Sequence, residues 1–474
     1  MGEQRDVFNV LNTGEKKEWN KRKEGADMKK NSSGFLGGIH PTDGSDKALT
    51  VQAPVTEVNP ELVEISMEQT PGNVCRLLVK EGDFVHRGQL IGIPQTFAAA
   101  AVHASVTGHV TKIKKTGSLG EVCVIRAEEA DTAPEVRSYQ TEWMENDGIT
   151  REDILHSMEK GGIIGMGGAG FPAFRKYQTE KNIQTILVNA AECEPYLTCD
   201  HILMREQPMG ILNGIQLLIK AAGAAEAVLC IEDNKLDVIE NFRTILKKKE
   251  VPIRLQELPT MYPQGGERQL IQSVLDMEVP SGGLPADVGV IVSNVATANA
   301  VADMVFAGLP LIRRYVTVSG CVERPGNFLV PVGTRFQELL RKAGDVSAGQ
   351  NQMIVGGPMT GYCIGTNVRA ERAEGAVSKA TSGILILPEQ VTTETPCIRC
   401  GACGRVCPAG LNPFKIDFAY RNGKLDVCRK LYATECIGCG ACSYVCPARI
   451  ELAFRNIAAR NAVKQTFRKK GVIQ

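Results

Sequence analysis

Eight cysteines near the C-terminus have the spacing of iron–sulfur ligands. They form two runs of the pattern C-x2-C-x2-C-x3-C-P, which are CIRCGACGRVCP at residues 397–408 and CIGCGACSYVCP at residues 436–447. In this pattern the first three thiolates bind one [4Fe–4S] cluster, and the fourth reaches the other cluster. The runs therefore predict two clusters. The ligands of one are Cys397, Cys400, Cys403 and Cys446, and those of the other are Cys436, Cys439, Cys442 and Cys407.

Two structural zinc sites are the alternative for these cysteines. Zinc binds two separated pairs of ligands and has no use for a third cysteine followed by C-P in each run, so we favour clusters. Cys428 lies between the runs and outside the pattern, and we expect it to be a buried thiol. The remaining cysteines are scattered and the charged N-terminus has no apolar segment, which indicates a reducing compartment.

A glycine-rich segment, GGIIGMGGAGFPAFRKY at residues 161–177, is the second candidate site. Glycines let a backbone approach a phosphate or a flavin ring closely, and Lys176 offers a positive charge to a phosphate. The segment precedes the first clear strand, so it does not fit the usual dinucleotide fingerprint.

The next segment, LVNAAECEPYLTCDHILM at residues 187–204, is a predicted strand that ends in polar and acidic residues. Ligands of open α/β sheets lie at the carboxyl ends of strands, which makes Asn189, Glu192 and Glu194 candidates for binding. A capped helix start with solvated glutamates is the alternative. Cys193 and Cys199 are expected to be structural thiols.

Alternating segments predict an α/β unit around these residues. Apolar runs of strand length lie at 183–190, 226–232, 251–258 and 288–294, and helical periodicity lies at 208–223 and 236–249. Buried strands that alternate with helices are typical of a mostly parallel sheet.

The sequence predicts two further units that consist mainly of β-strands. VCRLLVKEGDFVHRGQLIGI and VHASVTGHVTKI resemble the lipoyl-type barrel-sandwich hybrid, but no lysine lies between Gln89 and Thr111 to carry a swinging arm. The tip is instead TFAAAA (Thr96–Ala101), so a structural or docking module is the better interpretation. Residues 311–390 hold short β runs around one amphipathic helix and resemble a β-grasp module of the soluble-ligand-binding type.

The glycine-rich segment, NAAECEPYLTCD and the two cysteine runs together resemble the RnfC family, and FLGGIHPTDGSDKALT at residues 35–50 resembles that family's start. The likeness covers about residues 35–450 and extends to the flavin subunit of respiratory complex I. It implies non-covalent FMN and an NADH site. The residues implied to bind them are Gly165, Gly167, Gly168, Gly170, Phe171, Lys176, Asn189, Glu192, Glu194, Tyr262, Gly265, Glu267, Asn294 and Thr297.

The sequence departs from the complex I pattern at five positions, so some polar contacts to flavin or nucleotide must differ. These positions are Met166, Ala191, Cys193, Gly266 and Ser293. Met166 and Cys193 fit the Rnf branch.

The likeness implies a peripheral subunit of a membrane-bound ferredoxin:NAD oxidoreductase, at the cytoplasmic face, whose partners are membrane subunits and a ferredoxin-like subunit. NADH exchanges two electrons as a hydride, whereas each cluster carries one electron at a time, so a flavin is needed between them to convert one kind of transfer into the other. The cofactors carry out this chemistry, so no side chain need act as a catalytic acid or base. The alternatives are a soluble flavin–iron–sulfur reductase for a corrinoid or redox regulator, and a two-cluster relay without nucleotide.

The 474 residues predict a multidomain α/β plus β chain. A net charge of +1 with 5% aromatic residues argues against nucleic-acid binding, and no stretch of about 18 apolar residues predicts a membrane span. The expected domains are a disordered extension at 1–33, a barrel-sandwich hybrid at 34–135, a Rossmann-like FMN/NADH domain at 136–310, a β-grasp module at 311–390, and a two-cluster ferredoxin-like helical domain with a basic C-terminal helix at 391–474.

Overall fold

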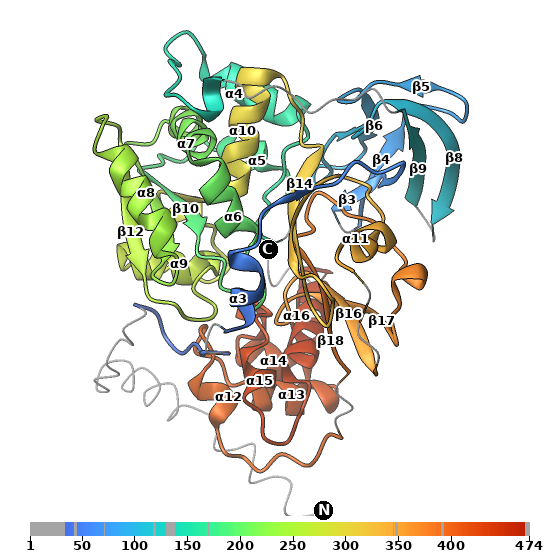
Figure 1. Ribbon diagram of the computed structural model, residues 1–474. Helices are drawn as coiled ribbons and strands as arrows, with labels where there is room; N and C mark the ends of the chain where they lie inside the picture. The colour runs from blue at the N-terminus through green and yellow to red at the C-terminus, as the bar shows by residue number, and fades with distance from the viewer. Residues whose placement is uncertain are drawn as a thin grey trace, which may run out of the picture.

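The computed structural model describes residues 34–41, 45–70, 72–116, 120–128, 138–168, 170–344, 346, 349–389 and 393–469. The extension expected at residues 1–33 lies outside these. Figure 1 shows a β unit at the upper right, an α/β unit at the upper left, a second β unit below the first, and a helical unit at the bottom.

The expected parallel sheet is present, with strand order β12-β11-β10-β13. Strands β10, β11 and β13 are nearly continuous apolar runs that are buried on both faces, as parallel strands require, whereas the edge strand β12 is only partly buried. Their bounds are β10 (Thr185–Ala190), β11 (Glu226–Glu232), β12 (Ile253–Leu258) and β13 (Val290–Asn294).

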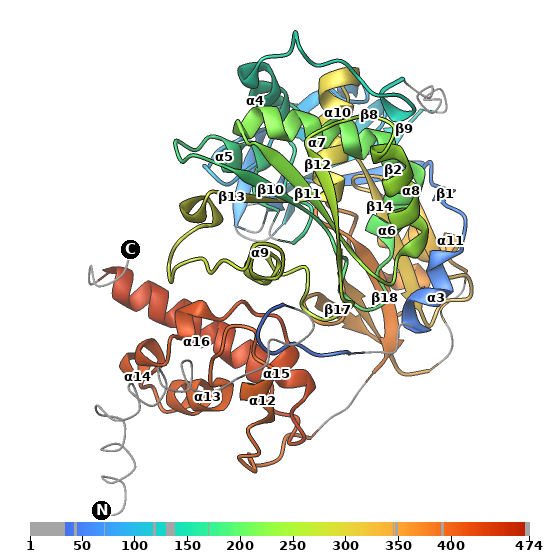
Figure 2. The ribbon, with the colours of Figure 1, turned by 90° about the vertical axis from the view of Figure 1, so that its left-hand side faces the viewer.

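Helices cover both faces of this sheet (Figure 2). Ile186 and Val188 share a core with the helices on one face, whereas Leu187 packs with Leu270 and Ile271 on the other. The helices are α4 (Arg151–Lys160), α5 (Ala173–Tyr177), α6 (Cys199–Glu206), α7 (Pro208–Ala222), α8 (Leu236–Leu246), α9 (Glu267–Leu275) and α10 (Val295–Ala307), with 3-10 turns η1 (Ser138–Gln140) and η2 (Pro285–Val288).

The N-terminal β unit contains two four-stranded sheets, β2-β9-β8-β5 and β3-β4-β6-β7, around one apolar core. Its short strands alternate with tight turns, as the sequence predicts. The bounds are β2 (Leu62–Ser66), β3 (Glu68–Thr70), β4 (Asn73–Leu77), β5 (Phe84–Val85), β6 (Leu90–Pro94), β7 (Val102–His103), β8 (Gly108–Thr116) and β9 (Gly120–Ala127).

The second β unit is a six-stranded mixed sheet of order β1-β15-β14-β18-β16-β17, packed on α11 (Phe336–Lys342). Its edge strand β1 comes from far upstream, as does α3 (Ser45–Val51), which contacts β14 and β15. The strands are β1 (Thr56–Glu57), β14 (Arg313–Gly320), β15 (Gly326–Pro331), β16 (Asn351–Val355), β17 (Tyr362–Thr366) and β18 (Gly383–Pro388), with η3 (Ala370–Arg372).

The C-terminal unit is helical and packs below α9 (Figure 2). Arg268 at the start of α9 pairs with Glu435 at 3.0 Å, which joins the α/β unit to the cysteine runs. The elements are α12 (Ala402–Arg405), α13 (Pro413–Arg421), α14 (Leu425–Lys430), η4 (Ala433–Glu435), α15 (Ala441–Tyr444) and α16 (Leu452–Lys469). No helix among the described residues has the length and apolarity to cross a membrane.

A buried lysine joins three of these units. Lys379 Nζ donates to the carbonyl oxygens of Ala101 and Gly162, both at 2.7 Å, and its backbone N–H donates to Gln69. Ala101 and Gln69 belong to the N-terminal β unit, and Gly162 is the second residue of the glycine-rich segment. Burial lowers the pKa of Lys379 from 10.5 to about 7.

This junction predicts a pH dependence of stability. Between about pH 7 and pH 10 the unfolded chain binds a proton at Lys379 that the folded chain does not, so stability should rise with pH over that range. We expect the melting temperature of wild type to increase relative to that of Lys379→Met as the pH is raised from 7 to 9. A difference between the two proteins that stays constant across this range would contradict the assignment.

Candidate functional site

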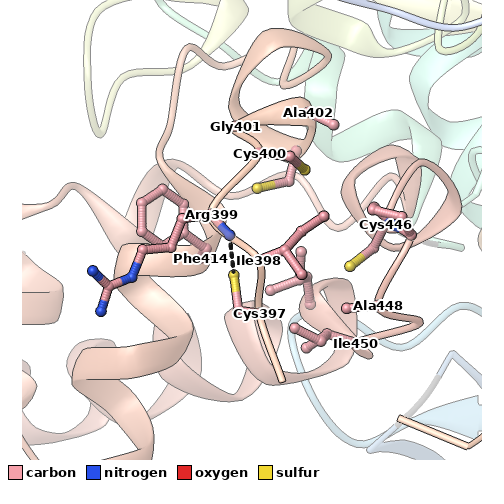
Figure 3. A pocket seen from close by; sticks show the side chains of 13 residues that line it. Cys397, Ile398, Arg399, Cys400, Gly401, Ala402, Phe414, Cys446, Ala448 and Ile450 are labelled. Carbon is pink, nitrogen blue, oxygen red and sulfur yellow. Dashed lines mark hydrogen bonds between the residues drawn. The ribbon is translucent and has the colours of Figure 1, made fainter. Parts of the chain in front are cut away.

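Four cysteine side chains surround one hollow in the helical unit. Cys397, Cys400, Cys403 and Cys446 line it together with apolar groups such as Phe414. Figure 3 shows the sulfur atoms of Cys397, Cys400 and Cys446 directed toward its centre. We call these four cysteines the outer set, because Cys397 and Cys400 are exposed.

The other four predicted ligands form an inner set, Cys407, Cys436, Cys439 and Cys442. Burial is the main cause that raises the pKa of Cys439 to about 11, and the neighbouring Cys407 and Cys436 raise it further. The structure therefore brings Cys407 of the first run to the second run, and Cys446 of the second run to the first.

Both sets fit a [4Fe–4S] cluster. Each set brings together four cysteines from the two runs, which is the ligand number that a cluster needs. In the inner set, where burial raises the pKa of Cys439, iron would supply compensating positive charge. Backbone N–H groups of Leu411 and Ala409 donate to Cys407, the kind of contact that tunes a cluster. Gly401 and Gly440 adopt φ of +74° and +81° and turn each run into its short helix.

Cys428 has no part in either set. Its side chain is fully buried among Ile416, Ala433 and Val463, as the sequence predicts for a bystander thiol.

The glycine-rich segment folds back over the N-terminus of α10. Thr297 Oγ1 accepts from Met166 N at 3.0 Å and donates to the carbonyl of Ile164 at 3.1 Å. A Cβ on Gly167 would lie 3.3 Å from Asn294 Cβ, so the backbone approaches Asn294 closely there. Gly165, Gly168 and Gly170 lie in the same turn, and Gly170 has φ of +64°. The N-terminus of a helix of 13 residues favours an anion.

Strand ends place two asparagines side by side. Asn189 in β10 pairs in register with Asn294 on the neighbouring parallel strand β13. Asn189 Nδ2 donates to the carbonyl of Gly265 at 2.8 Å, and Asn294 Nδ2 donates to Asp200 at 2.7 Å. Asn189 thus contacts the loop that holds Tyr262 and Gly265, whereas Asn294 contacts α6.

Lys176 and Glu267 lie at the same edge. Lys176 Nζ is 2.9 Å from Glu267 Oε1 and 3.1 Å from the carbonyl oxygen of Val292, the residue two before Asn294. Both side chains are partly exposed, so the pair contributes little stability by itself. The Lys176 ammonium group is held at this edge by two protein acceptors.

The two glutamates contact protein groups. Glu192 accepts from the backbone N–H groups of Asp200 and His201 at 2.6 and 3.1 Å, and so caps α6. This is the alternative that the sequence leaves open. Glu194 accepts from Met359 N at 3.0 Å and from the Thr360 hydroxyl, and burial raises its pKa.

Aromatic side chains lie beside the glycine-rich segment. Phe171 contacts Phe97 at a ring-centroid distance of 6.0 Å, and Arg175 lies 4.3 Å above the Phe97 ring. Phe97 is 65% exposed and belongs to the tip of the N-terminal β unit. The tip that carries no lysine therefore reaches the candidate site.

Sequence reasoning missed the charges that support the strand-end segment. Lys235 Nζ donates to the Ala191 carbonyl at 2.6 Å and pairs with Glu232 at 3.3 Å, and all of these groups are buried. Lys47 donates to the carbonyls of Glu192 and Leu197. The charged sequence IEDNK at the end of an apolar strand could have identified Lys235 as a supporting residue. No comparable sequence pattern surrounds Lys47.

Burial raises the pKa of Asp200 to about 6, and the neighbouring Glu192 adds to this rise. The sequence pattern did not single out Asp200, although it lies between two predicted binding residues.

Four family models match the chain. They are the RnfC barrel sandwich hybrid domain at residues 33–125, the Nuo51 FMN-binding domain at 158–303, the SLBB domain at 315–362 and the 4Fe-4S dicluster domain at 396–450. The fold and the two sites thus define a multidomain α/β iron–sulfur flavoprotein.

Curated relatives specify the family. The chain is 38% identical over 402 residues to the RnfC subunit of the Na(+)-translocating ferredoxin:NAD(+) oxidoreductase complex of Acetobacterium woodii, and the match covers 82% of this chain and 88% of that protein. It is 36% identical over 390 residues to the counterpart from the proton-translocating complex of Clostridium ljungdahlii, covering 80% and 82%. The chain belongs to the RnfC family.

Among solved structures, an air-oxidized NAD+-reducing [NiFe]-hydrogenase aligns with a TM-score of 0.47 at 19% identity, covering 68% of this chain and 63% of that one. That likeness is too weak to support an argument.

The two sets predict distinct losses of iron. After anaerobic reconstitution we expect about eight iron ions per wild-type chain and about four in Cys442→Ala, since one cluster loses a ligand. Cys428→Ala removes a thiol of the same unit outside both sets and should keep about eight. Equal iron content in the two variants, measured by colorimetric assay, would contradict the ligand assignment.

Proposed function

We propose that the chain is the peripheral subunit of a ferredoxin:NAD oxidoreductase of the Rnf type that passes electrons between NAD(H), FMN and two [4Fe–4S] clusters. Partner membrane subunits and a ferredoxin-like subunit would couple this transfer to ion transport. The names of the relatives and the FMN and dicluster models support this function. One observation carries it: the loop that bonds to Asn189 also bonds, through Tyr262, to the inner cysteine set.

The residues proposed to hold FMN and NAD(H) surround the carboxyl edge of the parallel sheet. When bound, FMN exchanges hydride with NAD(H) and single electrons with the clusters. The chain supplies position and charge. The residues are Gly165, Gly167, Gly168, Gly170, Phe171, Lys176, Asn189, Glu192, Glu194, Tyr262, Gly265, Glu267, Asn294 and Thr297.

Each group at this edge has a defined task in the proposal. Lys176 and the N-terminus of α10 offer positive potential to the flavin phosphate. The turn that begins at Gly165 lets the backbone approach the ligand. Glu194, whose carboxylate is fixed by Met359 and Thr360, sets the boundary of the site on the side of the second β unit.

The outer cysteine set is proposed as the site of exchange with a partner protein. Cys397 and Cys400 are exposed, and Ile398 between them is 69% exposed. An apolar side chain beside exposed thiolates suits a transient protein contact.

The finer assignments are part of this proposal. The strand order β12-β11-β10-β13 supports a Rossmann-like flavin domain at 136–310, and the mixed sheet with α11 supports a β-grasp module at 311–390. A barrel-sandwich hybrid at 34–135 and a two-cluster domain at 391–474 complete the division. The location is proposed to be the cytoplasmic face of a membrane.

The function is tested by adding NADH to the anaerobically reconstituted chain. We expect flavin absorbance in the loaded protein and bleaching of the cluster absorbance by NADH. A chain that holds clusters but binds no flavin would be a relay without nucleotide. A loaded chain whose clusters NADH leaves oxidised would contradict the proposal.

Lys176→Met tests the phosphate contact. Loss of a charge-assisted hydrogen bond of about 1.5–3 kcal/mol should weaken FMN binding roughly ten- to hundredfold. Lys181→Met is the matched control, because Lys181 is 62% exposed and pairs only with Asp287 among the ion pairs of the described residues. The measurement is fluorescence titration of the flavin-free chain, and equal affinities in both variants would exclude Lys176 from the site.

A further inference from the structure

Tyr262 connects the candidate flavin edge to a cluster ligand. Its hydroxyl donates to the carbonyl oxygen of Cys439, a member of the inner set, at 2.6 Å, and its side chain is 2% exposed. In the same loop Gly265 N donates to Cys193 Sγ at 3.4 Å, and the Gly265 carbonyl accepts from Asn189. One short loop therefore contacts both the strand-end segment and the inner set.

The N-terminal segment at residues 35–41 holds this loop against the helical unit. Ile39 and Tyr262 exchange two backbone hydrogen bonds of 2.8 and 2.9 Å, and Gly38 N donates to the Val406 carbonyl at 3.1 Å. A Cβ on Gly37, which has φ of +72°, would lie 2.7 Å from that carbonyl oxygen. Figure 2 shows this dark blue segment between the helical unit and the rest of the molecule.

A third contact comes from the second β unit. A Cβ on Gly440, in the inner-set loop, would lie 2.7 Å from the carbonyl oxygen of Met359. Met359 N in turn donates to Glu194 in the strand-end segment. The α/β unit, the N-terminal segment and the second β unit thus all contact the helical unit close to the inner set.

We propose that Tyr262, besides its place at the flavin edge, is a positioning residue for electron transfer between that edge and the inner cluster, acting through its hydrogen bond to the Cys439 backbone. The proposal rests on the proposed function. The hydroxyl places the positive end of its dipole toward the ligand backbone of the inner set. That field stabilises the extra negative charge of a reduced cluster, so the bond raises the reduction potential of the inner cluster.

The matched pair of variants is Tyr262→Phe and Tyr444→Phe. The Tyr444 hydroxyl also donates at 2.6 Å to a backbone carbonyl across the same joint, but its acceptor is Pro41, which is no ligand. Both variants lose one hydroxyl between the helical unit and its neighbours. Only Tyr262→Phe loses a bond to a cluster cysteine.

The measurement is a mediator-poised redox titration followed by electron paramagnetic resonance on the reconstituted chain. The inner-cluster signal is the one that Cys442→Ala removes. In Tyr262→Phe we expect that signal to move to more negative potential. The expected change in the ratio of reduced to oxidised cluster is about three- to tenfold at fixed potential, and tenfold equals about 59 mV for one electron. The potential of the outer-cluster signal should not change in Tyr262→Phe, and Tyr444→Phe should shift the potential of neither cluster signal.

Loss of the inner cluster alone in Tyr262→Phe, seen as half the iron, would show that the contact is only structural and would overturn the proposal. An unmoved inner signal, equal shifts in both variants, or loss of both clusters would overturn it. Chemical mediators set the potential here without NADH. A wild-type chain whose clusters NADH fails to reduce would therefore refute the proposed function while this titration still decides the role of Tyr262.

Discussion

The carboxyl edge of the four-stranded parallel sheet is the constraint on which the other features depend. The carboxyl ends of parallel strands all lie at one edge of a sheet. Here Asn189, the residue before the end of β10, pairs in register with Asn294, the last residue of β13. The glycine-rich segment, the N-terminus of α10 and the loop that begins at Tyr262 all converge on that edge. Each of them bonds to a residue at or near a strand end.

Buried charges keep this edge in place. The ammonium group of Lys235 holds the Ala191 carbonyl, and its pairing with Glu232 compensates part of the desolvation of both groups. The Glu192 carboxylate caps α6, so the same segment that carries binding candidates also begins a helix. The candidate binding residues and the helix cap therefore share one stretch of chain, and the cap helps to fix the position of its backbone.

The units are connected by polar contacts to backbone carbonyls. Lys379 joins the N-terminal β unit to the glycine-rich segment, and Tyr262 joins the α/β unit to the inner cysteine set. A buried donor that loses its acceptor costs about 1–3 kcal/mol, so such bonds resist separation of the units. A fixed arrangement suits a chain in which electrons must cross from one unit to another.

The sequence by itself determined the features that depend on near neighbours in the chain. The cysteine spacing predicted the two ligand sets, and apolar runs predicted the four parallel strands, because spacing and strand period are local properties. Resemblance supplied the residues of the candidate flavin edge. Asn189 bonds to Gly265 there and Thr297 bonds to the glycine-rich segment, while Glu192 serves as a helix cap. Tertiary structure alone decided which groups meet across the joints. The Tyr262 hydroxyl reaches Cys439 across 177 positions and Lys379 reaches Ala101 across 278, and no local pattern encodes such contacts because they exist only after the separate cores have packed together.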